Sequence, residues 1–107
     1  MNKKYTLIFN PQIYVDIQNQ VDYYFEETKS HTLGQRFVEA LKIGLKKLES
    51  NPFLYEVKYS DVRCLPIEKF PHRAHYRIVG TEVFVEAVFG TKENPVKWKR
   101  RIKKRNE

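Results

Sequence analysis

The spacing of apolar residues changes halfway along this 107-residue chain, and the change predicts two structural layers. In the first half, apolar positions recur every three or four residues, which is typical of amphipathic helices. In the second half they alternate with polar residues or run together, which is typical of strands. Helices that precede a run of hairpin-linked strands favour an α+β domain, with a helical hairpin on one face of a mainly antiparallel sheet.

The first helix is predicted to follow a short strand over residues 5–9. Asn10-Pro11 is typical of a helix start, because asparagine caps a helix and proline fits its first turn. The helix should continue to about residue 28. Its apolar face is formed by residues at helical spacing, namely Ile13, Tyr14, Ile17, Val21, Tyr24 and Phe25.

The second helix is predicted to begin at Thr32, where Gln35 completes a capping-box pattern, and to end at Asn51-Pro52. Because about three residues separate the two helices, they should form an antiparallel hairpin. Gly44 lies on the apolar stripe, so we expect it to permit close approach of the two helices. The stripe consists of Leu33, Phe37, Ala40, Leu41, Gly44 and Leu48.

Three strands are predicted after the helices. Residues 54–59 and 62–65 are strand-like, and in residues 73–78 an apolar face alternates with a basic one. Gly80-Thr81 indicates a tight hairpin, and the nearly continuous apolar run 83–89 suits a central strand covered on both faces. The basic face carries Arg73, His75 and Arg77. The arginines Arg63, Arg73 and Arg77 could bind phosphate, or one or more of them could pair with Glu56, Glu82 or Glu86 on neighbouring strands.

Charge is concentrated at the C-terminus. The net charge is +7, but residues 1–95 carry 13 Lys and Arg against 12 Asp and Glu, whereas residues 96–107 carry 7 against 1. A short basic helix is predicted after Asn94-Pro95, and its charge favours an anionic partner such as RNA, DNA or an acidic protein segment, or serves only solubility. We treat residues 1–107 as one domain with a basic tail at about 95–107.

Composition narrows the class of protein. The chain has 41% hydrophobic residues, enough for a core, and no apolar run near the length of a membrane span. Cys64 is the only cysteine, so an internal disulfide and a multi-cysteine zinc site are both excluded, and we expect a small buried side chain there. The sequence therefore predicts a cytoplasmic protein with no membrane partner, no metal and no cofactor.

Four stretches in this order resemble the RelE/ParE superfamily of toxins from bacterial type II toxin–antitoxin systems. The resemblance implies a β-α-α-β-β-β fold and a cognate antitoxin that wraps around the toxin. We expect the antitoxin to use the basic sheet face and tail in part. The stretches are Gln35-Arg36-Phe37, Leu48-Glu49-Ser50-Asn51-Pro52, Val62-Arg63 with Lys69-Phe70-Pro71 and Tyr76, and Val83 with Ala87-Val88-Phe89, Asn94-Pro95, Trp98 and Arg101.

One branch of this superfamily, the RelE-like toxins, cuts mRNA on the ribosome without a metal. By resemblance, Arg73 matches the sheet arginine of that branch and Lys92 stands where it has another arginine, so both would be catalytic in a ribonuclease. Trp98 replaces the catalytic tyrosine, and an indole has no proton to exchange near neutral pH. Trp98 could still stack on a base or anchor the tail, and His75 could titrate on the basic face.

The other branch, the ParE-like toxins, inhibits DNA gyrase and has no known catalytic residues. Phe70-Pro71 and the Asn94-Pro95 ending with Trp98 are closer to this branch, so the sequence favours gyrase inhibition. A ribosome-dependent mRNA endoribonuclease and a degenerate, non-toxic antitoxin-binding module remain alternatives, so enzymatic activity is open. The candidate target-binding residues are Lys58, Arg63, Lys69, His75, Arg77, Trp98, Arg100 and Arg101.

Overall fold

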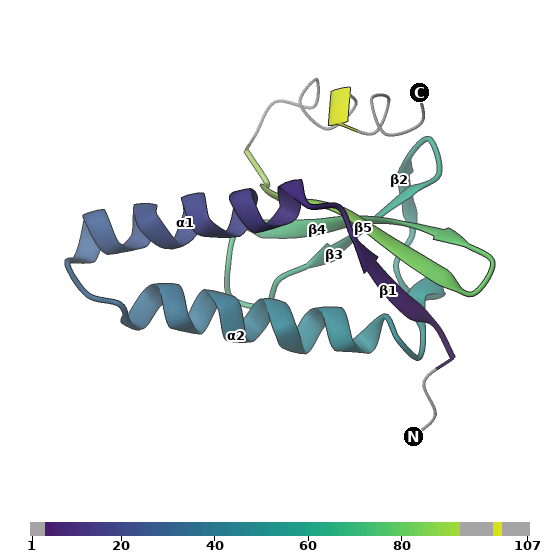
Figure 1. Cartoon of the computed structure of the whole chain (residues 1–107), viewed down its shortest axis with the longest axis horizontal. Helices are drawn as coiled ribbons and strands as arrows, with labels where there is room; N and C mark the ends of the chain where they lie inside the picture. The colour runs from purple at the N-terminus through teal and green to yellow at the C-terminus, as the bar shows by residue number, and fades with distance from the viewer. Residues whose placement is uncertain (1–3, 93–99, 102–107) are drawn as a thin grey trace.

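The computed structural model describes residues 4–92 and 100–101, and it shows two helices packed on a five-stranded sheet (Figure 1). The elements are β1 (Thr6–Phe9), α1 (Gln12–Thr28), α2 (Thr32–Lys47), the 3-10 turn η1 (Pro52–Leu54), β2 (Val57–Tyr59), β3 (Val62–Pro66), β4 (His72–Val79) and β5 (Glu82–Gly90). The strand order is β1-β5-β4-β3-β2. Only β1 pairs in parallel, so the predicted α+β class and mainly antiparallel sheet are confirmed.

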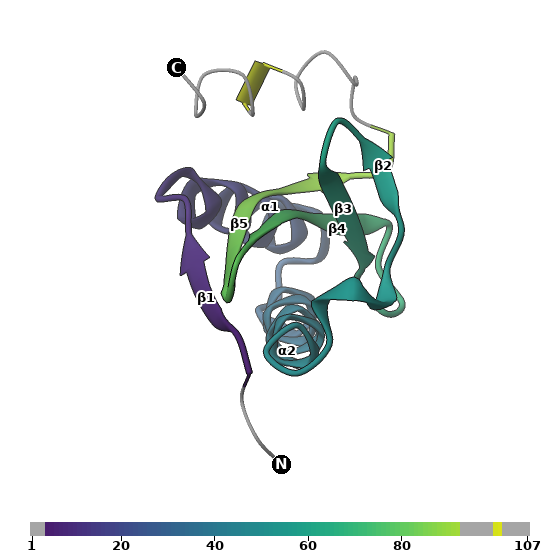
Figure 2. The same ribbon diagram turned by 90° about the vertical axis from the view of Figure 1, so that its right-hand side faces the viewer.

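The two strand-like stretches in region 54–65 each form a strand, so the order of elements agrees with the prediction and only the number of strands differs. They form two short antiparallel strands, β2 and β3, which turn at Ser60 in the left-handed backbone region (φ 48°). The sheet therefore has four strands after the helices where the sequence predicts three. Viewed from the side, β1 and β2 lie at opposite edges of the curved sheet (Figure 2). The predicted Gly80-Thr81 hairpin between β4 and β5 is confirmed, with Gly80 at φ 62°.

The core lies between the two helices and one face of the sheet. Two residues of the predicted face of α1 lie outside the core. Tyr14 is 62% exposed, and Phe25 is half-buried and stacks on His31. Val83, Val85 and Val88 of β5 face this core, while Ala87 and Phe89 are buried on the opposite side, so β5 is covered on both faces as predicted. The core residues contributed by the helices and the segment after α2 are Ile13, Tyr24, Phe37, Leu41, Leu45 and Leu48.

The two helical glycines have different neighbours. A Cβ added to Gly34 would lie 3.1 Å from Val21 Cγ1 on α1, whereas a Cβ added to Gly44 would lie 3.1 Å from Leu65 Cδ2 on β3. The prediction that Gly44 permits helix–helix approach is therefore wrong: Gly34 has that position. Gly44 instead lets α2 pack closely on β3, and it is buried as its place on the apolar stripe predicts.

The starts of both helices differ in detail from the predictions. The N-cap of α1 is Pro11, one residue later than the predicted Asn10. Asn10 Oδ1 accepts a hydrogen bond from the Gln12 backbone N–H at 2.9 Å, so Asn10 stabilises the start of α1. The capping box of α2 is absent, since its N-cap is His31 and makes no side-chain cap bond. Ser30 Oγ accepts the Thr32 N–H at 3.2 Å instead, so this end is satisfied by the interhelical loop.

Candidate functional site

The sheet face opposite the helices is the first candidate site, and we call it the open face. It carries Tyr59, Cys64, Arg73, His75, Arg77 and Phe89. Alternate residues of β4 point to this face, and directly paired residues on neighbouring strands share it. His75 pairs with Cys64 on β3, and Arg73 pairs with Phe89 on β5. The predicted alternation of β4 into an apolar and a basic face is therefore confirmed.

A β-bulge at Glu86 shapes the open face. His75 pairs with Ala87 and Tyr76 pairs with Val85, so Glu86 is an extra residue on β5. The bulge shifts the alternation, which turns Val88 toward the helices and Phe89 toward the open face. Glu86 itself is fully buried. The sequence predicts neither feature, because a glutamate inside an apolar strand carries no local mark of a bulge.

His75 is at the centre of a buried cluster rather than on the surface. Its side chain is 1% exposed, and its Nδ1 lies 2.9 Å from the Tyr59 hydroxyl and 3.6 Å from Cys64 Sγ. Burial raises the pKa of Tyr59 and the pKa of Cys64 above their ordinary values. Both groups therefore stay protonated near neutral pH, and neither suits the role of general base or thiolate nucleophile. Burial also confirms the structural role expected for Cys64.

Arg77 is held by acidic side chains. Its Nε lies 3.1 Å from both Asp61 carboxylate oxygens, and its Nη1 lies 3.9 Å from Glu86 Oε2. Asn10 Nδ2 donates a hydrogen bond to the other Glu86 oxygen at 3.3 Å. The predicted pairing with Glu86 is confirmed, and the Arg77 charge is neutralised within the fold. A guanidinium shared by two carboxylates is less available to a phosphate than an unpaired one.

Arg101 is held more tightly still. It forms a bidentate pair with Asp16 of α1, with Nη1–Oδ2 at 3.0 Å and Nη2–Oδ1 at 3.1 Å. Its Nη1 also donates to the Glu86 carbonyl at 3.1 Å, and its guanidinium lies 4.9 Å from the centre of the Phe89 ring. We call this contact the Arg101 clamp. It joins the C-terminal segment to both α1 and β5.

The Arg101 clamp completes the edge of β5. β1 pairs with β5 only as far as Val85. Beyond that residue, the edge of β5 that faces away from β4 has no strand beside it among the described residues. Asp16 Oδ2 accepts the Val88 N–H at 3.0 Å, and Arg101 takes the Glu86 carbonyl. Buried and part-buried backbone groups need hydrogen-bond partners. At this edge of β5 the side chains of Asp16 and Arg101 supply the hydrogen bonds that a neighbouring strand would otherwise make. Sequence analysis did not identify Asp16 as important.

Arg63 does not join the open-face arginines, whereas Lys58 lies close enough to Cys64 to act on the pKa of that thiol, as Arg73 does. Arg63 pairs with Tyr76, whose side chain is in the core, so Arg63 lies on the helix side of the sheet. There its Nη1 donates to the Tyr55 carbonyl at 2.6 Å and its guanidinium lies 5.1 Å from the Phe53 ring centre. Lys58 forms an exposed pair with Glu56 at 2.9 Å.

The other candidate cations are dispersed. Lys69 lies in the β3–β4 loop beside α2, and Lys92 lies near Tyr23 on the α1 side of the molecule. Arg100 is exposed and helical, next to Arg101. Trp98 and most of the predicted basic tail fall outside the described residues. The structure therefore brings together Arg73, His75, Arg77 and Arg101, with Lys58 near Cys64 at the edge of this face, and leaves Arg63, Lys69 and Lys92 apart from them.

Arg73 is the open-face arginine for which the structure gives no acidic partner among the described residues. It is half-buried, and within residues 4–92 and 100–101 its side chain has no hydrogen bond or ion pair. The described residues also contain no group of three or more metal-ligating side chains. No helix among them has the length and apolar character needed to cross a membrane. Among the described residues, the open face therefore offers one unpaired guanidinium beside the buried cluster of Tyr59, His75 and Cys64.

Comparison with known proteins identifies the fold. No family model and no curated protein matches the sequence. Among solved structures, a chain of the "Chromosomal ParDE TA system from P. aeruginosa" superposes with a TM-score of 0.72 at 17% identity, covering 83% of this chain and 98% of that chain. The chain has a ParE-like fold. The fold expected from the sequence resemblance to the RelE/ParE superfamily is thus confirmed.

Proposed function

We propose that the chain is the toxin of a type II toxin–antitoxin system, which arrests growth by inhibiting DNA gyrase until its antitoxin binds. The observation that carries the proposal is the structural match to a ParDE chain over 98% of that chain's length. The four sequence stretches that resemble the superfamily support it independently. The proposed compartment is the cytoplasm, where gyrase acts.

The open face supports a gyrase inhibitor over a ribonuclease. Cleavage of RNA without a metal needs a base for the 2′-hydroxyl, cations for the developing phosphorane charge and an acid for the leaving oxygen. Arg77 and Arg101 are paired with carboxylates, and Tyr59 and Cys64 stay protonated. These are the features of a face stabilised for folding, not of one arranged for proton transfer.

A supercoiling assay tests the proposal directly. Purified full-length protein is added to DNA gyrase with relaxed plasmid, and the supercoiled product is measured on a gel against protein concentration. The proposal expects inhibition that purified antitoxin reverses. Unchanged supercoiling at a large excess of the protein would contradict the gyrase target.

One observation keeps ribosome-dependent mRNA cleavage as a second candidate. Arg73 matches the sheet arginine expected in a ribonuclease, and its guanidinium is unpaired among the described residues. A translating extract with the purified protein, followed by mapping of mRNA 5′ ends, distinguishes the two. New 5′ ends inside coding sequence would favour the ribonuclease, with Arg73 and Lys92 as the residues to test.

A further inference from the structure

β2 leaves one edge of the sheet open. It is the last strand in the order β1-β5-β4-β3-β2, and within residues 4–92 and 100–101 no strand pairs with its outer edge (Figure 2). An open edge of this kind presents backbone N–H and C=O groups that can pair with another extended segment. The side chains around β2 indicate which segment fits it.

Exposed apolar side chains lie beside this edge. Phe53 is 54% exposed, Leu54 63% and Val57 46%, although all three are residue types that are usually buried. Phe53 lies on the helix side of the sheet, where the Arg63 guanidinium is 5.1 Å from its ring centre, and Val57 shares that side because it pairs with Arg63. The name β2 edge is used below for Phe53, Leu54, Glu56, Val57 and Lys58.

The charges of the β2 edge are arranged symmetrically about Val57. Glu56 precedes Val57 and Lys58 follows it, and the two charged side chains form an ion pair at 2.9 Å while 77% and 44% exposed. An ion pair this exposed contributes little to stability, so either charge can exchange its partner at small cost. In the reverse direction the same three positions carry the opposite charges. Residues 56–58 are therefore complementary to a second copy of themselves that runs antiparallel.

Antiparallel pairing about Val57 matches all three positions. Val57 of one copy lies opposite Val57 of the other, and Glu56 of each copy lies opposite Lys58 of the other. Side chains of opposite charge stabilise an antiparallel pair when they are directly opposite, and like charges destabilise it. A parallel pairing in register would place like charges side by side, so the charges select the antiparallel orientation.

A β-bulge limits the pairing to this short stretch. Lys58 is an extra residue between Val57, which pairs with Arg63, and Tyr59, which pairs with Val62. Bulges and lysines on an edge strand oppose indiscriminate pairing with other chains. The lysine meets a glutamate, however, when the second chain is a copy of this one. The β2 edge is therefore unfavourable for most extended segments but complementary to itself.

We propose that two copies of the chain form a two-fold dimer through antiparallel pairing of their β2 edges. Each copy contributes five strands to one joined sheet, and the exposed apolar residues of both copies lie on the same side of it. A contact of this size supports a weak, concentration-dependent dimer and not a permanent one. The proposal does not rest on the proposed function, since it uses only residues 53–58.

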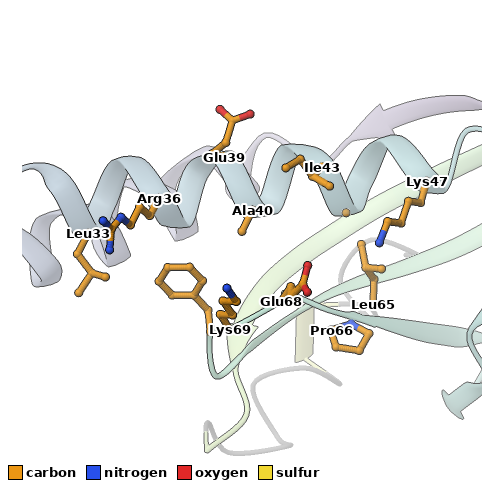
Figure 3. Close-up of a pocket in the computed structure, with 12 residues that line it drawn as sticks. Leu33, Arg36, Glu39, Ala40, Ile43, Lys47, Leu65, Pro66, Glu68 and Lys69 are labelled. Atoms are coloured by element: carbon orange, nitrogen blue, oxygen red, sulfur yellow. The ribbon is translucent and has the colours of Figure 1, made fainter.

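The β2 edge is separate from the groove between α2 and the β3–β4 loop. That groove has a volume of about 530 Å³, and Figure 3 shows Leu65 and Lys69 across it from α2. None of the residues that line it belongs to the β2 edge. Substitutions at the β2 edge therefore leave the groove lining intact, which separates tests of self-association from tests of partner binding.

Cross-linking at the proposed two-fold axis tests the geometry. Directly opposite residues of an antiparallel pair have Cα atoms about 4.5–5.5 Å apart, within the range of a disulfide. Under mild oxidation, full-length Val57→Cys is expected to give a covalent dimer on a non-reducing gel. Val15→Cys, at a valine of α1 that is 50% exposed, is expected to remain a monomer, and Cys64 is buried in both. Equal cross-linking of the two variants, or none in Val57→Cys, would overturn the proposal.

Charge exchange tests the register. Glu56→Lys and Lys58→Glu each place like charges opposite each other at two positions of the homodimer. Each is therefore expected to raise the dissociation constant of the dimer at least about tenfold in sedimentation velocity. An equimolar mixture of the two variants has opposite charges across the axis again, and so does the double variant Glu56→Lys/Lys58→Glu. Both are expected to dimerise within about threefold of the wild type.

The control makes the same changes of net charge elsewhere. Glu26→Lys and Lys29→Glu alter an ion pair of α1 whose side chains are each 71% exposed, and neither is expected to change the dissociation constant more than about threefold. A wild-type protein that stays monomeric up to millimolar concentration would overturn the proposal. So would single variants of Glu56 and Lys58 that dimerise as tightly as the wild type, or a mixture of them that fails to recover dimerisation.

Discussion

The open face and the groove between α2 and the β3–β4 loop both contain basic residues, but these cations are paired to different extents. On the open face, Arg77 and Arg101 are paired with Asp61, Glu86 and Asp16, and the apolar residues around them are buried. Along that groove, Arg36, Lys47 and Lys69 form no ion pair with any residue that the structure describes, and Ile43 is exposed.

The difference shows that a basic residue indicates a binding site only when its charge is not already used within the fold. An arginine held by a bidentate carboxylate contributes mainly to stability, and a partner would have to break that pair to bind it. Mutation of a paired arginine such as Arg101 is therefore expected to lower stability, whereas mutation of an unpaired cation such as Arg73 or Lys47 is expected to change stability little.

The largest effect on stability is expected at the Arg101 clamp. Arg101→Ala leaves Asp16 without its cation at a site where both side chains are largely buried, and this should lower the free energy of unfolding by about 3 kcal/mol. Urea denaturation measures the change. The matched control is Lys29→Ala, which removes a pair with Glu26 whose side chains are each 71% exposed, with an expected loss below about 0.5 kcal/mol. Similar losses in both variants would show that the buried Arg101–Asp16 pair contributes no more to stability than an exposed ion pair.

Gly44→Leu should have the next largest effect. The new side chain would overlap Leu65, and overpacking of this kind costs about 1–3 kcal/mol. Leu65→Ala is destabilising by itself, but combined with Gly44→Leu it should be less so than the sum of the two changes, because it makes room for the added leucine. Thermal unfolding of the three variants measures the coupling. Strict additivity would show that Gly44 does not pack against Leu65.

Alkaline pH should destabilise the open face through Tyr59. Because its pKa is raised in the folded state, the unfolded chain loses the proton first as pH rises. The contribution of the protonated Tyr59 hydroxyl to folding stability is therefore complete below about pH 10, the ordinary tyrosine pKa, and is lost progressively above it. Tyr59→Phe should therefore flatten the decrease in melting temperature above pH 10. Parallel pH profiles for the variant and wild type would show that Tyr59 does not cause the alkaline loss of stability. The control is Tyr14→Phe, which changes an exposed tyrosine.

The smallest effect is expected from Arg73→Ala on growth arrest. If gyrase is the target and the open face does not bind RNA, the variant should remain as toxic as the wild type at equal expression. Colony counts after induction measure this, with a blot for protein level. Loss of toxicity in a folded Arg73→Ala variant, together with mRNA cleavage by the wild type, would favour the ribonuclease.

Much of the fold follows from local patterns in the sequence. The apolar stripes of α1 and α2, the Gly80-Thr81 hairpin and the apolar run of β5 each identify their element because one periodicity dominates there. Boundaries and local exceptions were harder to predict. The exposure of Tyr14 depends on how α1 is placed on β5, and no helical stripe contains that information.

The site was only partly predictable, because charge pairing is a long-range property. Arg73, His75 and Arg77 share a face as their alternation on β4 predicts. Asp16 and Arg101 are 85 residues apart in sequence, so no motif links them. The burial of His75 depends on Tyr59, Cys64 and Phe89 from three other strands, and Arg63 is taken to the helix side by the register of β3.

The measurement that tests the central claim most directly is the order of events after induction in living cells. The protein is expressed from a tightly controlled promoter, and a DNA-damage reporter and mapped mRNA 5′ ends are followed in the same culture, with and without the neighbouring gene. Gyrase inhibition predicts an early DNA-damage response with intact mRNA, and co-expression of the antitoxin should abolish it. Early cleavage of mRNA without that response, or no growth arrest at all, would contradict the claim.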